Sequence, residues 1–449
     1  MIDETILFLT YYFRQQDRDH RILKHVIGRF GGAYLPFDLH LSAPLERIFS
    51  KVIVYDFLLR RAELGVRAMN DEVLALVKNE RPKYVLWTSF YDDIRKSTLE
   101  AIRKGGTRVV GWFFDDEWRF HSYSKYWISY LDYCVTNAIS VEPAYRKLGA
   151  RVIQTIPNTG IGVDVDWAHL EEKHDVTFVG SIRTADRKWY VEELKRNNIA
   201  VEIFGEGSGG YVSFHQMLDI YRTSKVNLNF SKTVDDRRPR QVKGRVFQVC
   251  LAGGFLLTEY APGIEKYFAL GKEIVCFGSP REMVDNARYY LTHEAERRAI
   301  ARAGWERAQG DYSSSRMVAR VFDEIEEDLA RGATDSAPAA RLKLSIHARR
   351  VLATYHLVWG RAQIEENDPR GLWKDDLALT LSYIPWHVLA RFYAILASLP
   401  WSIRSSVFSG LRRMESRRFS MTAGDLRYVW QTLKSFVGRM TKGLLRRPR

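Results

Sequence analysis

Short apolar runs alternate with amphipathic stretches along the first three quarters of the chain. In the first 170 residues the apolar runs are ILFLTYYF, KVIVYDFLL, YVLWTSF, RVVGWFFDD, DYCVTNA and VIQTIPN. The alternation restarts at Asp175 with DVTFVGS, AVEIFGEG, KVNLNFS, FLLTEY and EIVCFGS, and charged helical stretches follow to about Leu329. Strands that alternate with helices favour a parallel, doubly wound sheet. The pattern therefore predicts two successive Rossmann-like α/β domains, residues 1–170 and 171–330.

The rest of the chain has a different composition. Residues 331–340, RGATDSAPAA, are typical of a linker, and residues 341–449 are predicted to form a basic, amphipathic helical extension. The formal net charge of the chain is +14, and residues 335–449 contain 20 Lys/Arg against 8 Asp/Glu, a net of +12. A large acidic partner would therefore meet this extension first.

Two segments of the extension have apolar residues at helical spacing. The first, residues 377–399, is interrupted by His387 and Arg391 and is too broken to predict a membrane span. The second, residues 426–444, has one apolar face with basic residues largely off it, which is typical of an interfacial amphipathic helix. An anionic membrane surface bound through residues 377–449 is one interpretation, and a helix packed on its own protein is the other. Nucleic acid is a weaker third, because the aromatic residues lie among the apolar positions.

The spacing of the cysteines and the first residues of the chain both bear on the cellular compartment of the protein. Cys134, Cys250 and Cys276 are far apart and form neither a zinc-binding nor a disulfide spacing. The first residues, MIDETILFLTYYF, contain acids instead of a positive leader and are predicted to form a first strand. We expect a cytoplasmic protein.

The segment KGRVFQVCLAGGFLLTEYAPGIEKYFALGKEIVCFG, residues 243–278, combines features that phosphate recognition needs. Lys243 and Arg245 fall where a helix begins, so their side chains and the free backbone N–H groups could hold one diphosphate together. Arg245 and Lys243 also end a basic loop that follows the apolar run KVNLNFS, at the carboxyl end of a predicted strand. An ordinary helix, loop and strand with charged flanks is the alternative.

The same segment contains a glycine pair and a buried strand. Gly253 and Gly254 are predicted to end the helix and to let a ligand approach the backbone. FLLTEY, with Thr258 and Glu259, is predicted to be a buried parallel strand that ends at the binding edge of the sheet. We expect all four residues to belong to the binding site.

Two glycine-containing turns follow the first strands of the second domain. Gly180, Ser181 and Arg183 come directly after DVTFV, and Gly205 and Gly207 begin a stretch that matches GxGxxG. A nicotinamide enzyme is the rival interpretation of this match. The dinucleotide fingerprint, however, belongs on the first strand-to-helix turn of its domain and needs an acid about 20 residues later, which is missing here. A glycine-rich turn that lines a nucleotide site, or a plain surface turn, remains.

In the first domain, carboxylates end the strand RVVGWFF. Asp115 and Asp116 lie at its carboxyl end, and His121 follows shortly afterwards. Such groups can act as a general base for an acceptor hydroxyl, and we take these three as catalytic candidates. A helix cap at Asp115 or Asp116, with Glu117 in the first turn, is the alternative. We expect no metal, because no second acidic cluster is present.

These motifs together resemble the CgeB-type (spore maturation protein) glycosyltransferase family of bacteria, whose members have the GT-B architecture. The resemblance is clearest from Asp175 to about Phe322, through FVGS, FGEG, KVNLNFS, the segment 243–278 and AGWERA. It implies two facing Rossmann-like domains, a nucleotide-sugar donor held by the second domain, an acceptor held mainly by the first, and no cofactor. Family positions on the phosphate side, at the basic helix start and at the glycine turn match Gly180, Arg183, Lys243, Arg245, Gly253 and Gly254.

One position departs from the family pattern. The family usually has Phe-Glu in the helix after the basic loop, where this chain has Phe247 and Gln248. The glutamate is expected to accept hydrogen bonds from ribose hydroxyls. Gln248 can still accept through its carbonyl oxygen, without charge assistance, which weakens the bond by on the order of 1 kcal/mol.

The resulting hypothesis is a cytoplasmic, metal-independent glycosyltransferase at the inner face of a membrane. It would move a hexose from a nucleotide-diphosphate donor to a lipid-linked or cell-envelope glycan. A catalytically weak glycan-binding or scaffolding protein of the same fold is the alternative.

Overall fold

The computed structural model describes residues 2–11, 20–30, 38–88, 90–157, 160–182, 184–205, 212–232, 240–332 and 341–415. Most of the predicted linker and the predicted helix 426–444 lie outside the described residues. Contacts divide the chain into two compact units, Met1–Tyr355 and His356–Arg449.

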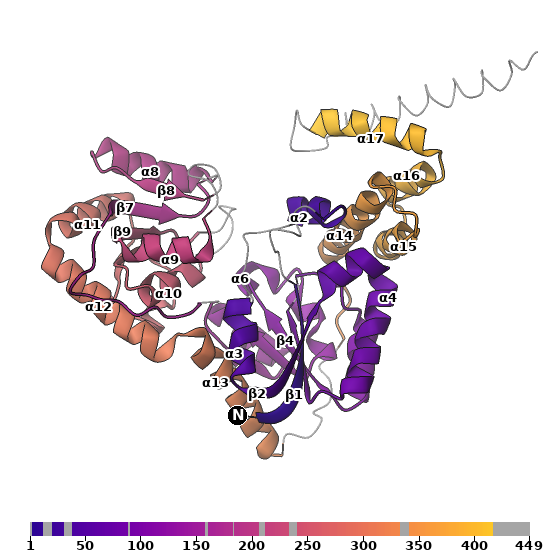
Figure 1. Ribbon diagram of the computed structural model, residues 1–449, viewed down its shortest axis with the longest axis horizontal. Helices are drawn as coiled ribbons and strands as arrows, with labels where there is room; N and C mark the ends of the chain where they lie inside the picture. The colour runs from indigo at the N-terminus through magenta and orange to yellow at the C-terminus, as the bar shows by residue number, and fades with distance from the viewer. Residues whose placement is uncertain are drawn as a thin grey trace, which may run out of the picture. The chain divides into compact units, whose positions relative to one another are not determined.

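The first domain contains a six-stranded parallel sheet with strand order β2-β1-β3-β4-β5-β6 (Figure 1). Its strands are β1 (Ile2–Thr10), β2 (Phe49–Asp56), β3 (Tyr84–Thr88), β4 (Arg108–Phe113), β5 (Tyr133–Thr136) and β6 (Val152–Gln154). Every residue of β3 and β5 is buried, as expected for parallel strands covered on both faces. The helices of this domain are α2 (Leu23–Phe30), α3 (Ala43–Glu46), α4 (Phe57–Glu80), α5 (Lys96–Lys104), α6 (Asp116–Arg119) and α7 (Glu142–Lys147).

The second domain contains a five-stranded parallel sheet with strand order β11-β10-β9-β7-β8. Its strands are β7 (His174–Val179), β8 (Glu202–Phe204), β9 (Ser224–Asn229), β10 (Leu256–Glu259) and β11 (Val275–Phe277). The helices are α8 (Ala185–Arg196), α9 (Phe214–Arg222), α10 (Gly244–Leu251), α11 (Pro280–Thr292), α12 (Glu294–Asp311) and α13 (Ser314–Ala330).

The strand orders place one topological switch point in each sheet. In the first sheet the chain moves outward from β1 to β2 and then returns to the other side with β3. In the second sheet the same reversal lies between β7 and β9. Ligands of open α/β sheets bind outside the carboxyl ends of the strands at such points.

Helix α13 follows the second sheet in sequence but packs against the first. The buried ring of Phe322 lies edge-on to Phe49 and Tyr84, with centroid separations of 4.8 and 5.5 Å. The Tyr84 hydroxyl donates a hydrogen bond of 2.8 Å to Glu326. The chain therefore returns to its first domain after completing the second.

The C-terminal region is helical. It consists of α14 (Ile346–Glu365), α15 (Trp373–Tyr383), α16 (Val388–Ala397) and α17 (Trp401–Glu415). Apolar side chains from all four helices form one cluster, which includes Leu357, Leu377, Tyr393 and Phe408. The two parallel sheets and this helical region confirm the predicted fold class. None of the helices in the described ranges is long and apolar enough to cross a membrane.

The apolar segment 377–399 is divided between two helices. Helix α15 ends at Tyr383 because Ile384, which precedes Pro385, adopts an extended conformation. His387 then caps α16, since its side chain accepts a hydrogen bond from the backbone N–H of Ala390. The interruption noted in the sequence is therefore a helix boundary.

Candidate active site

Arg245, in the first turn of α10, lies against the carboxyl ends of two strands. Its Nη1 donates a hydrogen bond of 2.8 Å to Oδ1 of Asn229, the last residue of β9. Its guanidinium carbon lies 4.9 Å from the ring centroid of Phe178 on β7. The side chain therefore spans the switch point between β7 and β9.

Glycine at position 180 makes this arrangement possible. A Cβ atom there would lie 2.6 Å from Nη2 of Arg245, and the φ angle of Gly180 is +151°. Gly205 has a φ of +121°, and a Cβ atom there would lie 3.3 Å from the backbone of Gly180. Both glycines were expected at the site from the sequence; Gly180 leaves room for Arg245, and Gly205 leaves room for the backbone of Gly180.

Two further cations converge on the same point. Lys243 Nζ and Arg187 Nη2 both donate to the carbonyl oxygen of Lys232, at 2.6 and 3.3 Å. Arg187 Nη1 also donates to the carbonyl of Ser181 at 2.7 Å. Arg187, Lys243 and Arg245 are named here the basic cluster.

The basic cluster has a surplus of positive charge. In the part of the chain that the structure describes, none of its three side chains forms an ion pair with a carboxylate. The buried Nε atoms of Arg187 and Arg245 have no hydrogen-bond partner. Buried donors without partners are costly, so the cluster is built to hold an anion with several acceptor oxygens.

Electrostatics lead to the same conclusion. Burial, followed by the charges of Arg187 and Arg245, lowers the pKa of Lys243 to about 6. Burial and the charge of Arg245 lower the pKa of Arg187 to about 10. Arg187 and Arg245 lie in the first turns of α8 and α10, and Lys243 is the residue that caps α10, so all three face the positive ends of helix dipoles. A bound anion would relieve this repulsion.

Thr258 and Glu259 support the basic cluster from below. Both are fully buried at the end of β10. The Glu259 carboxylate accepts hydrogen bonds from the Tyr190 hydroxyl and from the backbone N–H and hydroxyl of Ser231, and it pairs with Arg240 at 3.1 Å. Asn229 Nδ2 donates to the Thr258 hydroxyl at 2.9 Å, which fixes the amide that holds Arg245. These two residues therefore position the site, and burial keeps them from a ligand.

The glycine pair lies at the other end of α10. Eight residues at 1.5 Å each separate it from the basic cluster by about 12 Å. A Cβ at Gly253 would lie 2.6 Å from Val165, and one at Gly254 would lie 2.5 Å from the Tyr221 carbonyl oxygen. Close packing of the protein on itself therefore accounts for both glycines, and we assign neither of them to ligand binding.

Three other predicted donor residues have different positions. Gln248, one turn after Arg245, is half-buried, and its side chain makes no hydrogen bond within the described ranges. Ser181 contributes its carbonyl oxygen to Arg187. Arg183 and Gly207 lie outside the described residues.

The catalytic candidates of the first domain separate from one another. Asp116 is fully buried, and its carboxylate accepts hydrogen bonds from Ser124, Thr136 and Tyr145, so it joins elements of its own domain. His121 is exposed, with its ring edge-on to Phe120. Asp115 contacts the second domain, because its Oδ1 accepts a hydrogen bond of 3.4 Å from Nε2 of Gln241.

Asp115 and Glu117 form the acidic side of the site. Asp115 adopts a left-handed conformation with φ 57° and ψ 31°, a strained backbone that is enriched at functional positions. Burial, with the charges of Asp115 and Asp116, raises the pKa of Glu117 to about 7, and the positive charge of Lys243 opposes this rise. Its buried Oε2 has no hydrogen-bond partner. Glu117 is therefore a carboxylate poised to exchange a proton near neutral pH.

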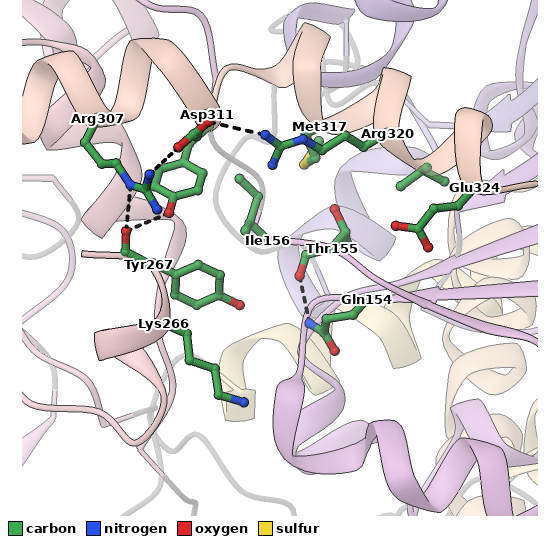
Figure 2. Close-up of a pocket in the computed structure, with 12 residues that line it drawn as sticks. Gln154, Thr155, Ile156, Lys266, Tyr267, Arg307, Asp311, Met317, Arg320 and Glu324 are labelled. Carbon is green, nitrogen blue, oxygen red and sulfur yellow. Dashed lines mark hydrogen bonds and ion pairs between the residues drawn. The ribbon is translucent and has the colours of Figure 1, made fainter. Parts of the chain in front are cut away.

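A pocket of about 420 Å³ is lined by residues of both α/β domains. Gln154, Thr155 and Ile156 line it at the end of β6, and Lys266 and Tyr267 line it after β10, as Figure 2 shows. The remaining lining residues come from α12, α13 and the turn between them: Arg307, Asp311, Tyr312, Met317, Arg320, Val321 and Glu324.

The pocket walls are polar and held in place. Asp311 pairs with Arg307 at 2.5 Å and with Arg320 at 3.3 Å, and the Tyr312 hydroxyl donates to the Tyr267 carbonyl at 2.6 Å (Figure 2). Burial, the charge of Tyr312 and the charge of Glu117 raise the pKa of Tyr267, so this pocket residue interacts electrostatically with Glu117. Hydroxyl-rich ligands suit walls of this kind.

The described residues contain no group of three or more His, Cys, Asp or Glu side chains that could hold a metal ion. The basic cluster presents cations to an anion, and Glu117 can exchange a proton near neutral pH.

Comparison with known proteins agrees with a site of this kind. Residues 183–323, which include the basic cluster, match the family model described as glycosyl transferase-like. A search of the curated proteins finds no match.

Several solved structures match this chain at low identity. Anabaena HepE, crystallised with UDP and glucose, is 11% identical with a TM-score of 0.43, over 72% of this chain and 100% of that one. A glycosyltransferase from Rickettsia africae is 10% identical with a TM-score of 0.46, over 73% and 99%. Sucrose-phosphate synthase from Thermosynechococcus elongatus is 7% identical with a TM-score of 0.48, over 73% and 100%.

The assignment of Gly254 to packing can be tested with one substitution. Gly254→Ala should destabilise the protein by about 1–3 kcal/mol, because the new Cβ would meet the Tyr221 carbonyl oxygen. Calorimetric binding of inorganic pyrophosphate to the folded protein should remain unchanged. Gly310→Ala is the matched control: no atom lies within 4 Å of its Cβ and the residue is helical, so its urea-unfolding free energy should not fall and should rise by at most about 1 kcal/mol. Weaker pyrophosphate binding by a stable Gly254→Ala variant would contradict the assignment.

Proposed function

We propose that this chain is a glycosyltransferase that uses a nucleotide-diphosphate sugar as donor. The observation that carries the proposal is the convergence of Arg187, Lys243 and Arg245 at the carboxyl ends of β7 and β9, with surplus positive charge and unpartnered buried donors. A diphosphate supplies the negative charge and the acceptor oxygens that this cluster lacks. The glycosyl transferase-like match over residues 183–323 supports the same reaction class.

The basic cluster would act on the leaving group. When the bond between the anomeric carbon and the diphosphate oxygen breaks, negative charge accumulates on the departing nucleoside diphosphate. Guanidinium and ammonium groups fixed in advance stabilise that charge more in the transition state than in the ground state. A divalent metal ion is then not needed for this task.

The acidic side would act on the acceptor. The acceptor hydroxyl oxygen forms a bond to the anomeric carbon, and its proton passes to a carboxylate. Glu117 suits this role because its pKa of about 7 allows it to be ionised at neutral pH and still basic enough to take a proton. Asp115, next to it at the strained end of β4, would orient the acceptor. The pocket lined by Tyr267, which interacts electrostatically with Glu117, would hold the hydroxyl-rich part of the acceptor.

We further propose a lipid-linked or cell-envelope glycan as the acceptor and a hexose as the transferred sugar. The protein would act from the cytoplasm at the inner face of a membrane, through its basic C-terminal region, as a member of the CgeB-type group. The support for the membrane is the net charge of +12, from 20 Lys/Arg against 8 Asp/Glu, in residues 335–449.

Donor binding is the first test. In a calorimetric screen of UDP-, GDP-, ADP-, CMP- and dTDP-sugars we expect at least one ligand to bind, and Arg245→Ala to weaken it roughly 10- to 100-fold. The reason is that a hydrogen bond to a charged group contributes about 1.5–3 kcal/mol. Arg281→Ala, in which an exposed arginine of α11 is removed, is the matched control and should bind as the wild type does. Absence of binding across the whole panel would contradict the proposed function and favour a scaffolding protein.

The pH dependence of donor binding tests the role of Lys243. Below pH 6 the amine is charged in the free protein, whereas above pH 6 it is neutral and must take up a proton to pair with the diphosphate. Donor affinity should therefore fall as the pH rises above 6, by at most about tenfold per unit, until the pKa of the bound state is reached. Calorimetry at pH 7.5 in two buffers with different ionisation enthalpies should show proton uptake. Lys243→Met should remove this uptake, and an unchanged uptake in that variant would contradict the role.

Glu117→Gln tests the acceptor side. We expect kcat to fall roughly 10²- to 10⁴-fold while donor affinity changes little, because the amide cannot accept the acceptor's proton. In the wild type, kcat/KM should rise with pH through about 7, where Glu117 loses its proton, and should then level off. Glu294→Gln, an exposed position on α12, should have no effect. Full activity of Glu117→Gln at pH 8 would exclude Glu117 as the base.

A further inference from the structure

Helix α16 has one face in the core of the C-terminal region and one face in solvent. Ala390, Tyr393 and Leu396 form the inner face and are buried. Val388 and Ile395 lie on the opposite face, with 72% and 60% of their surface exposed. The inner face already packs in the core of this region, so that core does not account for the apolar side chains on the outer face.

Two exposed tryptophans flank α16 in the sequence. Trp386 precedes the helix and is 68% exposed, and Trp401, which begins α17, is 42% exposed. Ten large apolar side chains are exposed among the described residues, and four of them fall between positions 386 and 401. The other six are scattered over both α/β domains and the start of α14. A cluster of this kind marks a surface that binds something apolar.

The charge of the segment around α16 indicates which kind of apolar partner fits this surface. The sequence contains no Asp or Glu between Asp376 and Glu415, whereas Arg391 and Arg404 lie within this stretch. Arg391 is exposed on the outer face of α16, and the Arg404 guanidinium lies 5.5 Å from the ring centroid of Trp401. Apolar side chains flanked by tryptophan and arginine are typical of elements that lie in the interfacial layer of a bilayer.

The dimensions of α16 fit the same partner. Ten residues span about 15 Å, half of the roughly 30 Å hydrocarbon core of a bilayer. The helix is long enough to lie in the interfacial layer and too short to cross the bilayer.

We propose that Trp386, Val388, Ile395 and Trp401 form a docking face that inserts into the surface of an anionic lipid bilayer, with Arg391 and Arg404 contacting lipid headgroups. This inference rests on the proposed action at a membrane face and identifies the residues that would make the contact. It differs from the expectation that residues 426–444 form the interfacial helix, because the docking face lies within the described part of the chain.

The test is flotation of the full-length protein with vesicles of phosphatidylcholine alone and with 30% phosphatidylglycerol. We expect binding to the anionic vesicles that weakens with added salt. The variant with Trp386→Ser, Val388→Ser, Ile395→Ser and Trp401→Ser should lose at least about tenfold in affinity. The variant with Trp189→Ser and Leu270→Ser, which removes exposed apolar side chains from the second domain, should bind as the wild type does.

Donor calorimetry on the same variants separates this inference from the proposed function. Equal donor affinity in all of them, with vesicle binding lost only in the fourfold variant, supports the docking face. Vesicle binding that survives in the fourfold variant overturns it. A wild-type protein that binds no vesicles also overturns it. If, in that case, the fourfold variant has a lower melting temperature or dissociates from an oligomer, the face is covered by the chain itself or by a second copy.

Discussion

The close approach of Arg245 to Gly180 is the contact on which the site depends. The guanidinium lies where a side chain at position 180 would otherwise be, on the ring of Phe178 and against the amide of Asn229. Any Cβ at position 180 would displace the group that joins β7 to β9. The glycine and the arginine are therefore one feature contributed by two strand ends, and the ligand-binding edge of the second sheet is organised around it.

The rest of the basic cluster is electrostatically unfavourable in the folded protein without a bound anion. Cations at the starts of α8 and α10 oppose the helix dipoles, and burial neutralises Lys243 at neutral pH. The protein nevertheless fixes the strand ends with the fully buried carboxylate of Glu259, which accepts hydrogen bonds from Tyr190 and from Ser231, two residues after the end of β9. Glu259 thus holds the strand ends in place while the cations of the basic cluster repel one another. This arrangement suits a preorganised anion site, since a bound anion would relieve the repulsion.

The sequence predicted the fold because parallel strands covered on both faces leave continuous apolar runs, and turn residues separate them. It also predicted the cationic helix start, because Lys243 and Arg245 end a basic loop that follows an apolar strand. It missed Arg187, which lies inside a helix and belongs to no local motif. The one signal was its position in the first turn of the helix that follows Gly180, where the helix dipole disfavours a cation. It grouped Gly253 and Gly254 with the ligand because glycines that admit a ligand and glycines that admit a neighbouring backbone look the same without coordinates. Likewise Asp115, Asp116 and Glu117 are three adjacent acids, and only burial separates a structural carboxylate from a titrating one.

The position of Gln248 changes what its departure from the family pattern implies. A glutamate there would lie one turn from Arg245, on the same side of α10. At an effective dielectric constant of about 20, two unit charges on the order of 8 Å apart interact by roughly 2 kcal/mol, so its negative charge would offset part of the attraction of nearby cations for a diphosphate. The glutamine loses about 1 kcal/mol of charge assistance toward a ribose hydroxyl and leaves the field of the basic cluster undiminished. These two effects have opposite signs and similar size. The neutral side chain at position 248 is therefore compatible with an active site whose donor affinity depends more on the diphosphate than on the ribose.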